Sequence, residues 1–376
     1  MTKKRAGPPA VTVPIRRHPW LGIHLVASLS ALAFLLTLLW IQFYTPNPPL
    51  LTPLRFRDPI PFSGKPKIAF LFLTRAGMPL DFVWHAFFMN ARVGNFSVYV
   101  HSKPGFKLDR STTRSPFFYG RHIEDSVQVI WGESSMIEAE RLLLSVALDD
   151  PANQRFVLLS DSCVPLYNFD YVYNYLISSQ KSFVDSFFDK KERRYNEKMA
   201  PSIPRHKWRK GSQWITLIRR HAEVIVDDDA IFPIFKQYCK RKLKDVDGHI
   251  FKPARKKPQS CIPDEHYVPT LLSMRELEDK LERRTLTYTL WNSSKSSWHP
   301  VTFKYGNASP QDIDKIKEIN NVYYDADLRT EWCQCNGTFV PCFLFARKFS
   351  RGAAVQLLSE GTFGPFDASS LLQESS

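Results

Sequence analysis

The first 44 residues of the sequence contain no acidic side chain. Residues 20–44 hold a single side chain that could be charged near neutral pH, His24, and are otherwise mostly apolar. A helix of that length crosses the ~30 Å hydrocarbon core of a bilayer. Residues 1–19 carry five basic side chains: Lys3, Lys4, Arg5, Arg16 and Arg17. Because positive charge stays on the cytoplasmic side, the sequence predicts a cytosolic tail (1–19), a transmembrane signal anchor (20–44) and a lumenal remainder.

The alternative for this segment is a cleaved signal peptide. Such a peptide has an apolar stretch of about 7–15 residues and a cleavage site of small residues. The segment here is longer, and its end at 40–46 offers no such site, so we expect a retained anchor. Residues 45–66 then contain seven prolines, which is typical of an extended spacer. We expect a stem there and one lumenal domain over 67–376.

The sequence also lacks the short motifs of several large enzyme classes. No G-x-G-x-x-G follows the first expected strand, and neither G-x-x-x-x-G-K-[ST], H-E-x-x-H nor G-x-S-x-G occurs. Their absence argues against a dinucleotide fold and against the P-loop, zinc-protease and α/β-hydrolase classes. The net charge is +14, and +9 remains once the five charges of the tail are removed. A basic lumenal domain suits a nucleotide diphosphate or an acidic glycan, whereas nucleic acid is a poor candidate in that compartment.

Cysteines and glycosylation sequons both lie beyond the expected anchor. Disulfides persist in the lumen, and six cysteines allow 15 pairings, so we expect structural disulfides whose pairing stays open. The cysteines are Cys163, Cys239, Cys261, Cys333, Cys335 and Cys342. The four N-x-S/T sequons, which are candidate glycosylation sites, begin at Asn95, Asn292, Asn307 and Asn336.

Strand and helix patterns alternate from Lys67 onward. The apolar run 67–74 predicts a strand buried on both faces, and the helical spacing over 80–91 predicts a helix. Further strands are expected over 96–101, 127–131, 155–161 and 182–188, and Ser135 with Glu138 forms a candidate capping box. This alternation predicts an α/β fold with a largely parallel sheet. Ligands of such sheets bind at the carboxyl ends of strands, which points to Thr74, His101, Trp131 and Asp161.

The expected central strand offers only one carboxylate for a metal ion, that of Asp161. Three Asp-x-Asp triplets occur, at 227–229, 245–247 and 325–327, but none follows a buried strand of the opening sheet. A hard divalent cation usually takes carboxylate ligands in addition to phosphates. We therefore expect neither metal nor cofactor, with basic side chains neutralising a diphosphate. Nine basic residues in 190–210 are either a solvated face or an anion-binding loop.

The best acid/base candidate is the segment 261–270, which contains Asp264, Glu265 and His266 in succession. At the start of an expected helix, Asp264 can cap the helix while Glu265 projects elsewhere as a base. From the letters alone, a capping Asp-Glu pair is commoner than a catalytic one.

Five segments in order resemble one known family. They are K-I-A-F-L-F-L-T-R (67–75), V-Y-V-H-S (98–102), L-L-S-D-S-C-V-P-L (158–166), K-W-R-K-G-S-Q-W (207–214) and P-D-E-H-Y (263–267). Together they are similar to the core-2/I-branching β-1,6-N-acetylglucosaminyltransferases, glycosyltransferase family 14, and most closely to its plant branch. The resemblance runs from about residue 67 to beyond 348, which is nearly the whole expected lumenal part.

The resemblance implies a GT-A-type (Rossmann-like) fold behind a Golgi type II anchor. It also implies metal-independent, inverting transfer from a UDP-sugar to a glycan acceptor. The family's catalytic base corresponds to Glu265, and the lysine that holds the donor diphosphate corresponds to Lys348. The acceptor-binding positions correspond to Glu197, Lys207, Arg209 and Trp291. Without the resemblance, Lys348 fits a surface lysine and His101 a strand-end histidine.

The sequence departs from the family at one point. The animal enzymes place an arginine in a strand before the late lysine, but 298–304 contains none, which leaves Lys304 or His299 as substitutes, or a different donor pose. The plant branch also includes enzymes that transfer glucuronic acid to arabinogalactan chains, so that the donor sugar is N-acetylglucosamine or glucuronic acid. The alternative function is a membrane-anchored glycan-binding or scaffolding protein that kept the fold and lost turnover.

Overall fold

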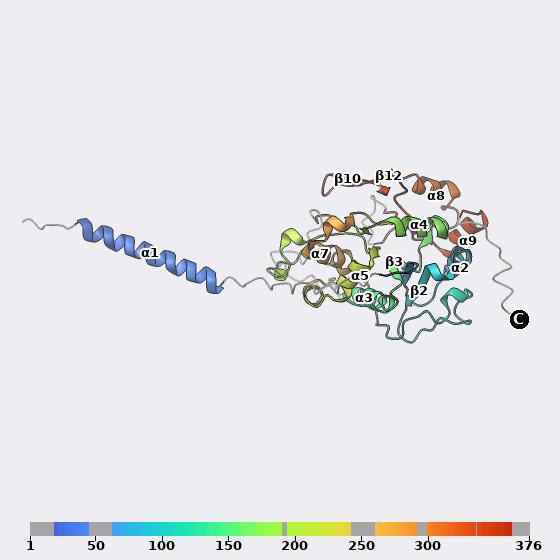
Figure 1. Ribbon diagram of the computed structural model, residues 1–376, viewed down its shortest axis with the longest axis horizontal. Coiled ribbons are helices and arrows are strands. Elements are labelled where there is room, and N and C mark those ends of the chain that lie inside the picture. Colours follow the sequence, from blue (N-terminus) through green and yellow to red (C-terminus); the bar gives the residue numbers. More distant parts are fainter. Residues whose placement is uncertain are drawn as a thin grey trace, which may run out of the picture. The chain divides into compact units, whose positions relative to one another are not determined.

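The computed structural model describes residues 19–44, 62–189, 194–241, 260–291, 299–335 and 337–362. The chain divides into two units, Met1–Leu50 and Leu51–Ser376. The first contains helix α1 (Pro19–Tyr44), drawn in blue in Figure 1. In the described part of the chain, no helix has both the length and the apolar character needed to cross a membrane. The anchor at 20–44 stays a prediction, and most of the expected stem lies outside the described residues.

The second unit is built on a six-stranded sheet with the order β2-β1-β3-β6-β5-β7. Strand β1 is the expected apolar run, and its residues from Ile68 onward are buried. β1 lies between β2 and β3 and runs parallel to both, so that Leu73 pairs with His101 on one side and with Ser160 on the other. The bounds are β1 Lys67–Leu73, β2 Phe96–His101, β3 Asn153–Ser160, β5 Ser182–Phe183, β6 Thr216–Ile218 and β7 Leu281–Glu282.

The sheet is rich in parallel pairs, as the sequence predicted, since β1 runs parallel to β2 and β3 and β5 runs parallel to β7, but it is mixed. Strand β6 runs antiparallel to both β3 and β5, and the expected strand 182–188 shortens to the two residues of β5. The predicted strand 127–131 is wrong, because those residues are irregular. The edge of β2 is occupied instead by 121–123, where the Val100 amide donates to Arg121 O and the Ile123 amide donates to Val100 O. An apolar run beside a sheet is therefore not always a strand of it.

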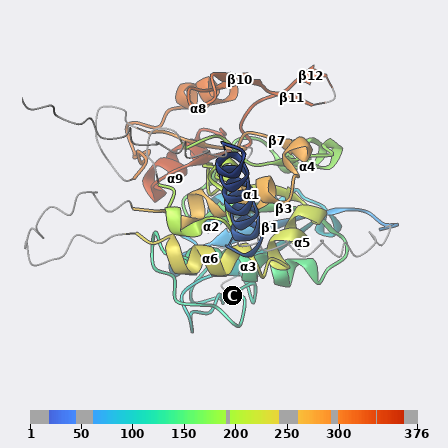
Figure 2. The ribbon, with the colours of Figure 1, turned by 90° about the vertical axis from the view of Figure 1, so that its left-hand side faces the viewer.

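Helices cover both faces of this sheet. Alternation along β1 sends Phe70 and Phe72 into one apolar cluster and Leu71 into the other. The first cluster includes residues of α2, α4 and α9, and the second includes residues of α3, α5, α6 and α7; Figure 2 shows α3 and α6 on the opposite side of β1 and β3 from α9. The bounds are α2 Asp81–Met89, α3 Ser135–Leu148, α4 Phe169–Ser178, α5 Arg219–Val226, α6 Ile231–Tyr238, α7 Tyr267–Met274, α8 Pro310–Lys317 and α9 Arg351–Ser359.

The helix expected at Ser135 is confirmed, but its capping box is wrong. The N-cap of α3 is Ser134, whose side chain makes no cap hydrogen bond. The Ser135 hydroxyl accepts a hydrogen bond from the Ile130 amide, and Glu138 pairs with Lys236. Both side chains therefore bind residues of other segments, and a local sequence pattern does not reveal such contacts.

A second, three-stranded sheet joins distant parts of the chain. Its order is β4-β13-β8, from Val164–Pro165, Phe345–Arg347 and Thr287–Thr289. β13 leads directly into Lys348, so this sheet sets where the late basic residues lie. Two hairpins precede β13 in the chain. They are β9 (Asn321–Tyr324) with β10 (Arg329–Trp332), and β11 (Gln334–Cys335) with β12 (Thr338–Phe339).

Within the described residues there are two disulfides, Cys239–Cys261 and Cys333–Cys342, and a buried free cysteine, Cys163. The expectation of structural disulfides is thus met, and the pairing that the sequence left open is given. Of the sequons, Asn95 is only 5 % exposed, which does not support a glycan there, and its glycosylation stays a prediction. Asn307 is exposed, while Asn292 and Asn336 lie outside the described residues.

Candidate active site

A cavity of about 1400 Å³ opens at the carboxyl ends of β1, β2 and β3. Thr74, His101 and Asp161, which the sequence placed at these strand ends, all line it. Thr74 donates both its amide and its hydroxyl hydrogen to His101 O, at 2.9 and 3.2 Å, which ties the ends of β1 and β2 together. The Val127 amide donates to His101 Nε2 at 3.1 Å. The irregular segment 127–131 thus closes over this end of the sheet and becomes part of the cavity wall.

One side of the cavity is cationic. Arg75 follows β1, Arg347 ends β13 and Lys348 comes next, and all three line the cavity together with Asp161. Burial, followed by the nearby charges of Arg347 and Arg75, lowers the pKa of Lys348. Burial raises the pKa of Asp161, against the opposing effect of the same cations. Three cations around one carboxyl group make this side a site for an anion.

A second part of the cavity wall, the acidic side, carries Glu265. Its carboxylate Oε2 lies 2.5 Å from Arg194 Nη1 and 3.5 Å from Lys210 Nζ, and its side chain is about one-quarter exposed. The Gly211 amide donates to Glu265 O at 2.8 Å, which fixes the backbone of the same residue. Glu265 is therefore held from both ends while it faces the cavity, as a positioned base requires.

The predicted helix cap at Asp264 is wrong. Pro263–Glu265 forms a short 3₁₀ turn whose N-cap is Ile262, and α7 starts after His266; neither start has a side-chain cap. Asp264 instead lines the cavity and is only 8 % exposed. Burial, and then the negative charge of Glu265, raise the pKa of Asp264 to about 7. The motif thus presents two carboxyl groups to the cavity and none to a helix end.

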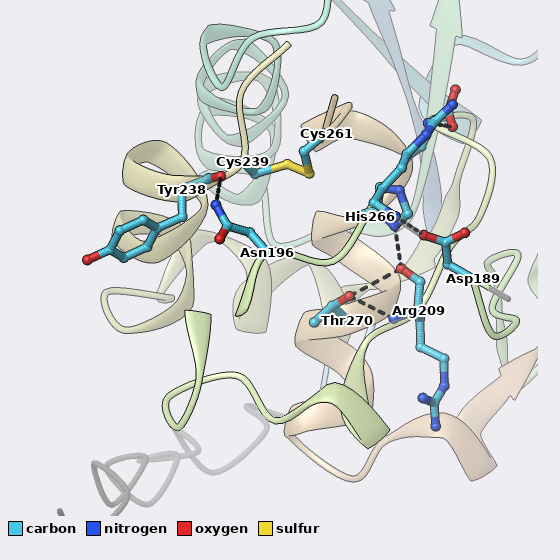
Figure 3. The surroundings of a disulfide bond; sticks show 10 residues. Asp189, Asn196, Arg209, Tyr238, Cys239, Cys261, His266 and Thr270 are labelled. Atoms are coloured by element: carbon cyan, nitrogen blue, oxygen red, sulfur yellow. Dashed lines mark hydrogen bonds and ion pairs between the residues drawn. A yellow bond between two sulfur atoms is a disulfide. The ribbon is translucent and has the colours of Figure 1, made fainter. Parts of the chain in front are cut away.

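The second half of the same motif is structural. His266 is buried, and burial lowers its pKa to about 3, so the ring is neutral. Its Nδ1 donates to Arg209 O at 2.8 Å, as Figure 3 shows beside the Cys239–Cys261 disulfide. The Tyr267 hydroxyl donates to Asp228 Oδ2 at 2.8 Å. These contacts anchor the turn that carries the two acids.

The K-W-R-K-G-S-Q-W segment holds that turn in place. Trp208 stacks on the His266 ring with a centroid distance of 4.5 Å, and Lys210 and Gly211 contact Glu265. A Cβ built at Gly211 would lie 2.1 Å from Asp185 O, so only glycine allows this close approach. Trp214 lies under the Arg347 guanidinium, 4.3 Å from ring centroid to Cζ. This segment therefore links the acidic and cationic sides.

The predicted acceptor residues divide into two groups. Trp291 lines the cavity and is 54 % exposed. Three others do not line it. Glu197 pairs with Arg205 on the surface, Lys207 donates to Ser273 O, and Arg209 is buried against Glu278. Their acceptor roles stay predictions, and these contacts give them no support.

The missing family arginine has candidates in the structure. His299 lines the cavity, where burial and the charge of Lys348 lower its pKa, whereas Lys304 is exposed and does not line it. Arg75 and Arg347 also line the cavity, although no sequence pattern assigned them to it. Arg75 was visible only as the residue after an apolar strand, and Arg347 only as the neighbour of Lys348. Asp185, Gln213 and Trp214 were also missed, because their place depends on packing between distant segments.

The acidic triplets lie in other surroundings. Asp228 accepts hydrogen bonds from the amides of Ile231 and Phe232 at the start of α6, and Asp327 pairs with Arg283. The triplet 245–247 lies outside the described residues. Among the residues that the structure does describe, there is no group of three or more His, Cys, Asp or Glu placed to hold a metal ion.

An α/β fold with an anion site and a carboxylate pair in one cavity fits an enzyme of group transfer. A family model described as Core-2/I-Branching enzyme matches residues 68–317. The chain belongs to this family, and it is a glycosyltransferase of family 14. It is 54 % identical over 312 residues to "Glycosyltransferase BC10" of Oryza sativa subsp. japonica, which covers 80 % of this chain and 77 % of the rice protein.

A comparison with solved structures adds a distant likeness. A crystal structure of an active-site mutant of LgtC overlaps 74 % of this chain and 86 % of its own, with a TM-score of 0.34 and 8 % sequence identity.

Proposed function

We propose that this glycosyltransferase moves N-acetylglucosamine or glucuronic acid from a UDP-sugar to a hydroxyl of a glycan acceptor, with inversion and without a metal ion. One cavity that holds both a cluster of cations around Asp161 and a carboxylate positioned as a base carries this proposal. Arg75, Arg347 and Lys348 suit the donor diphosphate, and Glu265, which lines the same cavity, is the base. A GT-A-type arrangement of the domain belongs to the same proposal.

The chemistry follows from where charge develops. The acceptor oxygen attacks the anomeric carbon of the donor while Glu265 takes the hydroxyl proton. The bond from the anomeric carbon to the diphosphate oxygen breaks with its electron pair, and UDP leaves. Lys348 and the two arginines stabilise the charge that appears on that oxygen. Attack from the face opposite the diphosphate inverts the anomeric centre.

The acceptor enters on the side of Glu265 in this scheme. Trp291 offers an exposed indole at the cavity wall, and an aromatic face is a suitable contact for the apolar face of a sugar ring. The size of the cavity, about 1400 Å³, exceeds the 300–1,000 Å³ usual for one small ligand. It therefore has room for a nucleotide sugar and part of a glycan together.

The proposed location is the Golgi membrane, with a type II orientation. Support comes from the basic residues 1–19 and from α1, in which every described side chain between Val26 and Trp40 is exposed although most are apolar. Protease added to intact microsomes should spare the large domain, and a glycosidase should change its mobility. A domain that protease removes from intact microsomes contradicts this orientation.

The test of the reaction uses the full chain in detergent with UDP-N-acetylglucosamine and UDP-glucuronic acid, each with an oligosaccharide panel. We expect transfer from one donor, an inverted anomeric configuration in the product by NMR, and unchanged turnover in EDTA. Turnover that EDTA abolishes and Mn²⁺ restores contradicts the metal-free mechanism. UDP binding without transfer or donor hydrolysis favours the alternative, a glycan-binding protein that lost turnover.

A further inference from the structure

Two neighbouring carboxyl groups of the cavity are treated differently by the fold. Glu265 has two cationic partners, Arg194 and Lys210. Asp264 lines the same cavity, yet its Oδ1 atom is buried and has no hydrogen-bond partner among the described residues. A buried carboxyl oxygen without a partner costs free energy. The residue as a whole keeps 8 % exposure and lines the cavity, so that a ligand in the cavity can supply this carboxyl group with a hydrogen bond that the fold does not.

A nearby buried carboxyl group that does not line the cavity receives its hydrogen bond from the protein itself. Glu140 of α3 is buried to 3 % exposure and interacts electrostatically with Asp264. It accepts a hydrogen bond from Gln213 Nε2 at 2.8 Å and does not line the cavity. Glu140 therefore serves as a matched comparison for Asp264: both are buried acids of the same neighbourhood, but only Asp264 faces the cavity.

Asp264 is close enough to both groups of charges to interact with each of them. It is the chain neighbour of Glu265, and its carboxyl group also interacts with the charge of Arg347. Arg347 immediately precedes Lys348. In an inverting displacement the anomeric carbon must lie between the attacking oxygen, near the base, and the departing diphosphate, near the cations. The part of the wall between base and cations therefore faces the sugar ring of the donor.

We propose that Asp264 binds a ring hydroxyl of the donor sugar and helps to determine which UDP-sugar is accepted. This inference rests on the proposed function. The recognised ligand is a UDP-linked pyranose with a free hydroxyl opposite the Asp264 carboxyl group. A carboxyl oxygen accepts a hydrogen bond from such a hydroxyl, and an analogue that lacks the hydroxyl or inverts it leaves the acid buried and unpaired.

The test measures sugar recognition separately from nucleotide recognition. Titration calorimetry on the full chain gives Kd for UDP and for whichever of UDP-N-acetylglucosamine and UDP-glucuronic acid the wild type transfers. The readout is the ratio of Kd for UDP to Kd for that UDP-sugar. Asp264→Leu keeps the approximate shape and removes both hydrogen-bonding atoms. We expect it to lower the ratio by about tenfold or more, and Glu140→Gln to leave the ratio unchanged.

The outcomes separate the inference from the function. An unchanged ratio in a folded Asp264→Leu variant overturns the inference and leaves the proposed function standing if the wild type transfers sugar. An equal loss of UDP and UDP-sugar affinity also overturns it, since it indicates a general distortion. If Asp264→Leu does not fold, Asp264→Asn decides in a titration at pH 8, above the pKa of Asp264 of about 7. A fall of about threefold is expected there, because an amide oxygen is a weaker acceptor than a carboxylate. A wild type that neither binds nor transfers either sugar overturns both.

Discussion

The cationic and acidic sides of the cavity are built in different ways. Arg75, Arg347 and Lys348 come from two strands of two different sheets and meet only after folding. Glu265 and Asp264 come from one turn, which the 207–214 segment supports through Trp208, Lys210 and Gly211. The first arrangement makes an electrostatic site in which several cations attract the same anion. The second arrangement positions a single base, because the Glu265 carboxylate must lie next to the acceptor hydroxyl.

This difference predicts different responses to mutation. A diffuse group of cations loses affinity in steps, because the remaining charges still attract the diphosphate. The base takes the proton of the acceptor hydroxyl, and no neighbouring residue occupies the same position to replace it. Loss of the base therefore slows the chemical step directly. The acidic side should therefore dominate turnover, and the cationic side should dominate nucleotide affinity.

The largest expected effect is that of Glu265→Gln. The amide keeps the shape and most hydrogen bonds but cannot take the acceptor proton, so turnover should fall by roughly 10²–10⁴-fold. Steady-state kinetics with saturating donor measures this loss. Glu318→Gln, at an exposed position after α8, is the control and should retain activity. Wild-type turnover in a folded Glu265→Gln protein would remove Glu265 from its role.

Gly211→Ala tests whether the acidic side depends on its supporting segment. The new methyl group would meet Asp185 O at 2.1 Å, so the backbone that bonds Glu265 has to move. We expect a loss of about 2 kcal/mol or more in unfolding free energy, with a fall in turnover larger than any fall in UDP affinity. Gly94→Ala is the matched control, since no atom lies within 4 Å of its added Cβ. If Gly211→Ala and Gly94→Ala have the same unfolding free energy, the close contact of Gly211 with Asp185 O is contradicted.

Lys348→Ala tests the cationic side. Removing one charge-assisted contact should weaken UDP binding by about tenfold, because such contacts contribute roughly 1.5–3 kcal/mol. Titration calorimetry with UDP measures the change. Lys280→Ala, whose side chain is 63 % exposed and pairs with Asp279, should leave the affinity unchanged, and so should Lys304→Ala. A Lys348→Ala protein with wild-type UDP affinity would make Lys348 an ordinary surface lysine.

The smallest expected effect concerns stability and pH. Burial raises the pKa of Asp264 from 3.8 to about 7, so between these values the folded chain holds a proton that the unfolded chain has released. Stability contributed by this group falls as pH rises through that window. Asp264→Asn should therefore gain stability relative to the wild type between pH 5 and pH 8, on the order of 2 kcal/mol. Chemical denaturation at both pH values measures it, and an equal difference at both contradicts the buried acid.

The sequence predicts those parts of the fold whose cause is local. The run of apolar residues in β1 needs burial on both faces whatever its neighbours are, and the helical spacing that follows leads directly to α2. The segment 127–131 has a similar apolar character, but the edge beside β2 is taken by 121–123, and no local pattern shows that. Asp264 was predicted as a cap for the same reason: its letters fit a helix start, while the chain turns once more before α7.

The site follows the same rule. Strand-end residues such as Thr74 and Asp161 could be placed because parallel strands bring their carboxyl ends together. Arg347 could not, since its position depends on β13 pairing with β4 and β8 across long stretches of chain. Glu197 and Arg209 carry charges in a basic segment that the sequence assigned to the acceptor. In the structure these charges are used for pairs with Arg205 and Glu278.

The most direct test of the two-sided cavity measures kcat and Kd for UDP on the same preparations of wild type, Glu265→Gln and Lys348→Ala. The account predicts that the effects fall on different quantities. Glu265→Gln should lose turnover and keep UDP affinity within about twofold, and Lys348→Ala should lose UDP affinity by about tenfold. A Glu265→Gln variant that loses turnover and UDP affinity in equal proportion would contradict the account, because base and diphosphate site would then not be separate.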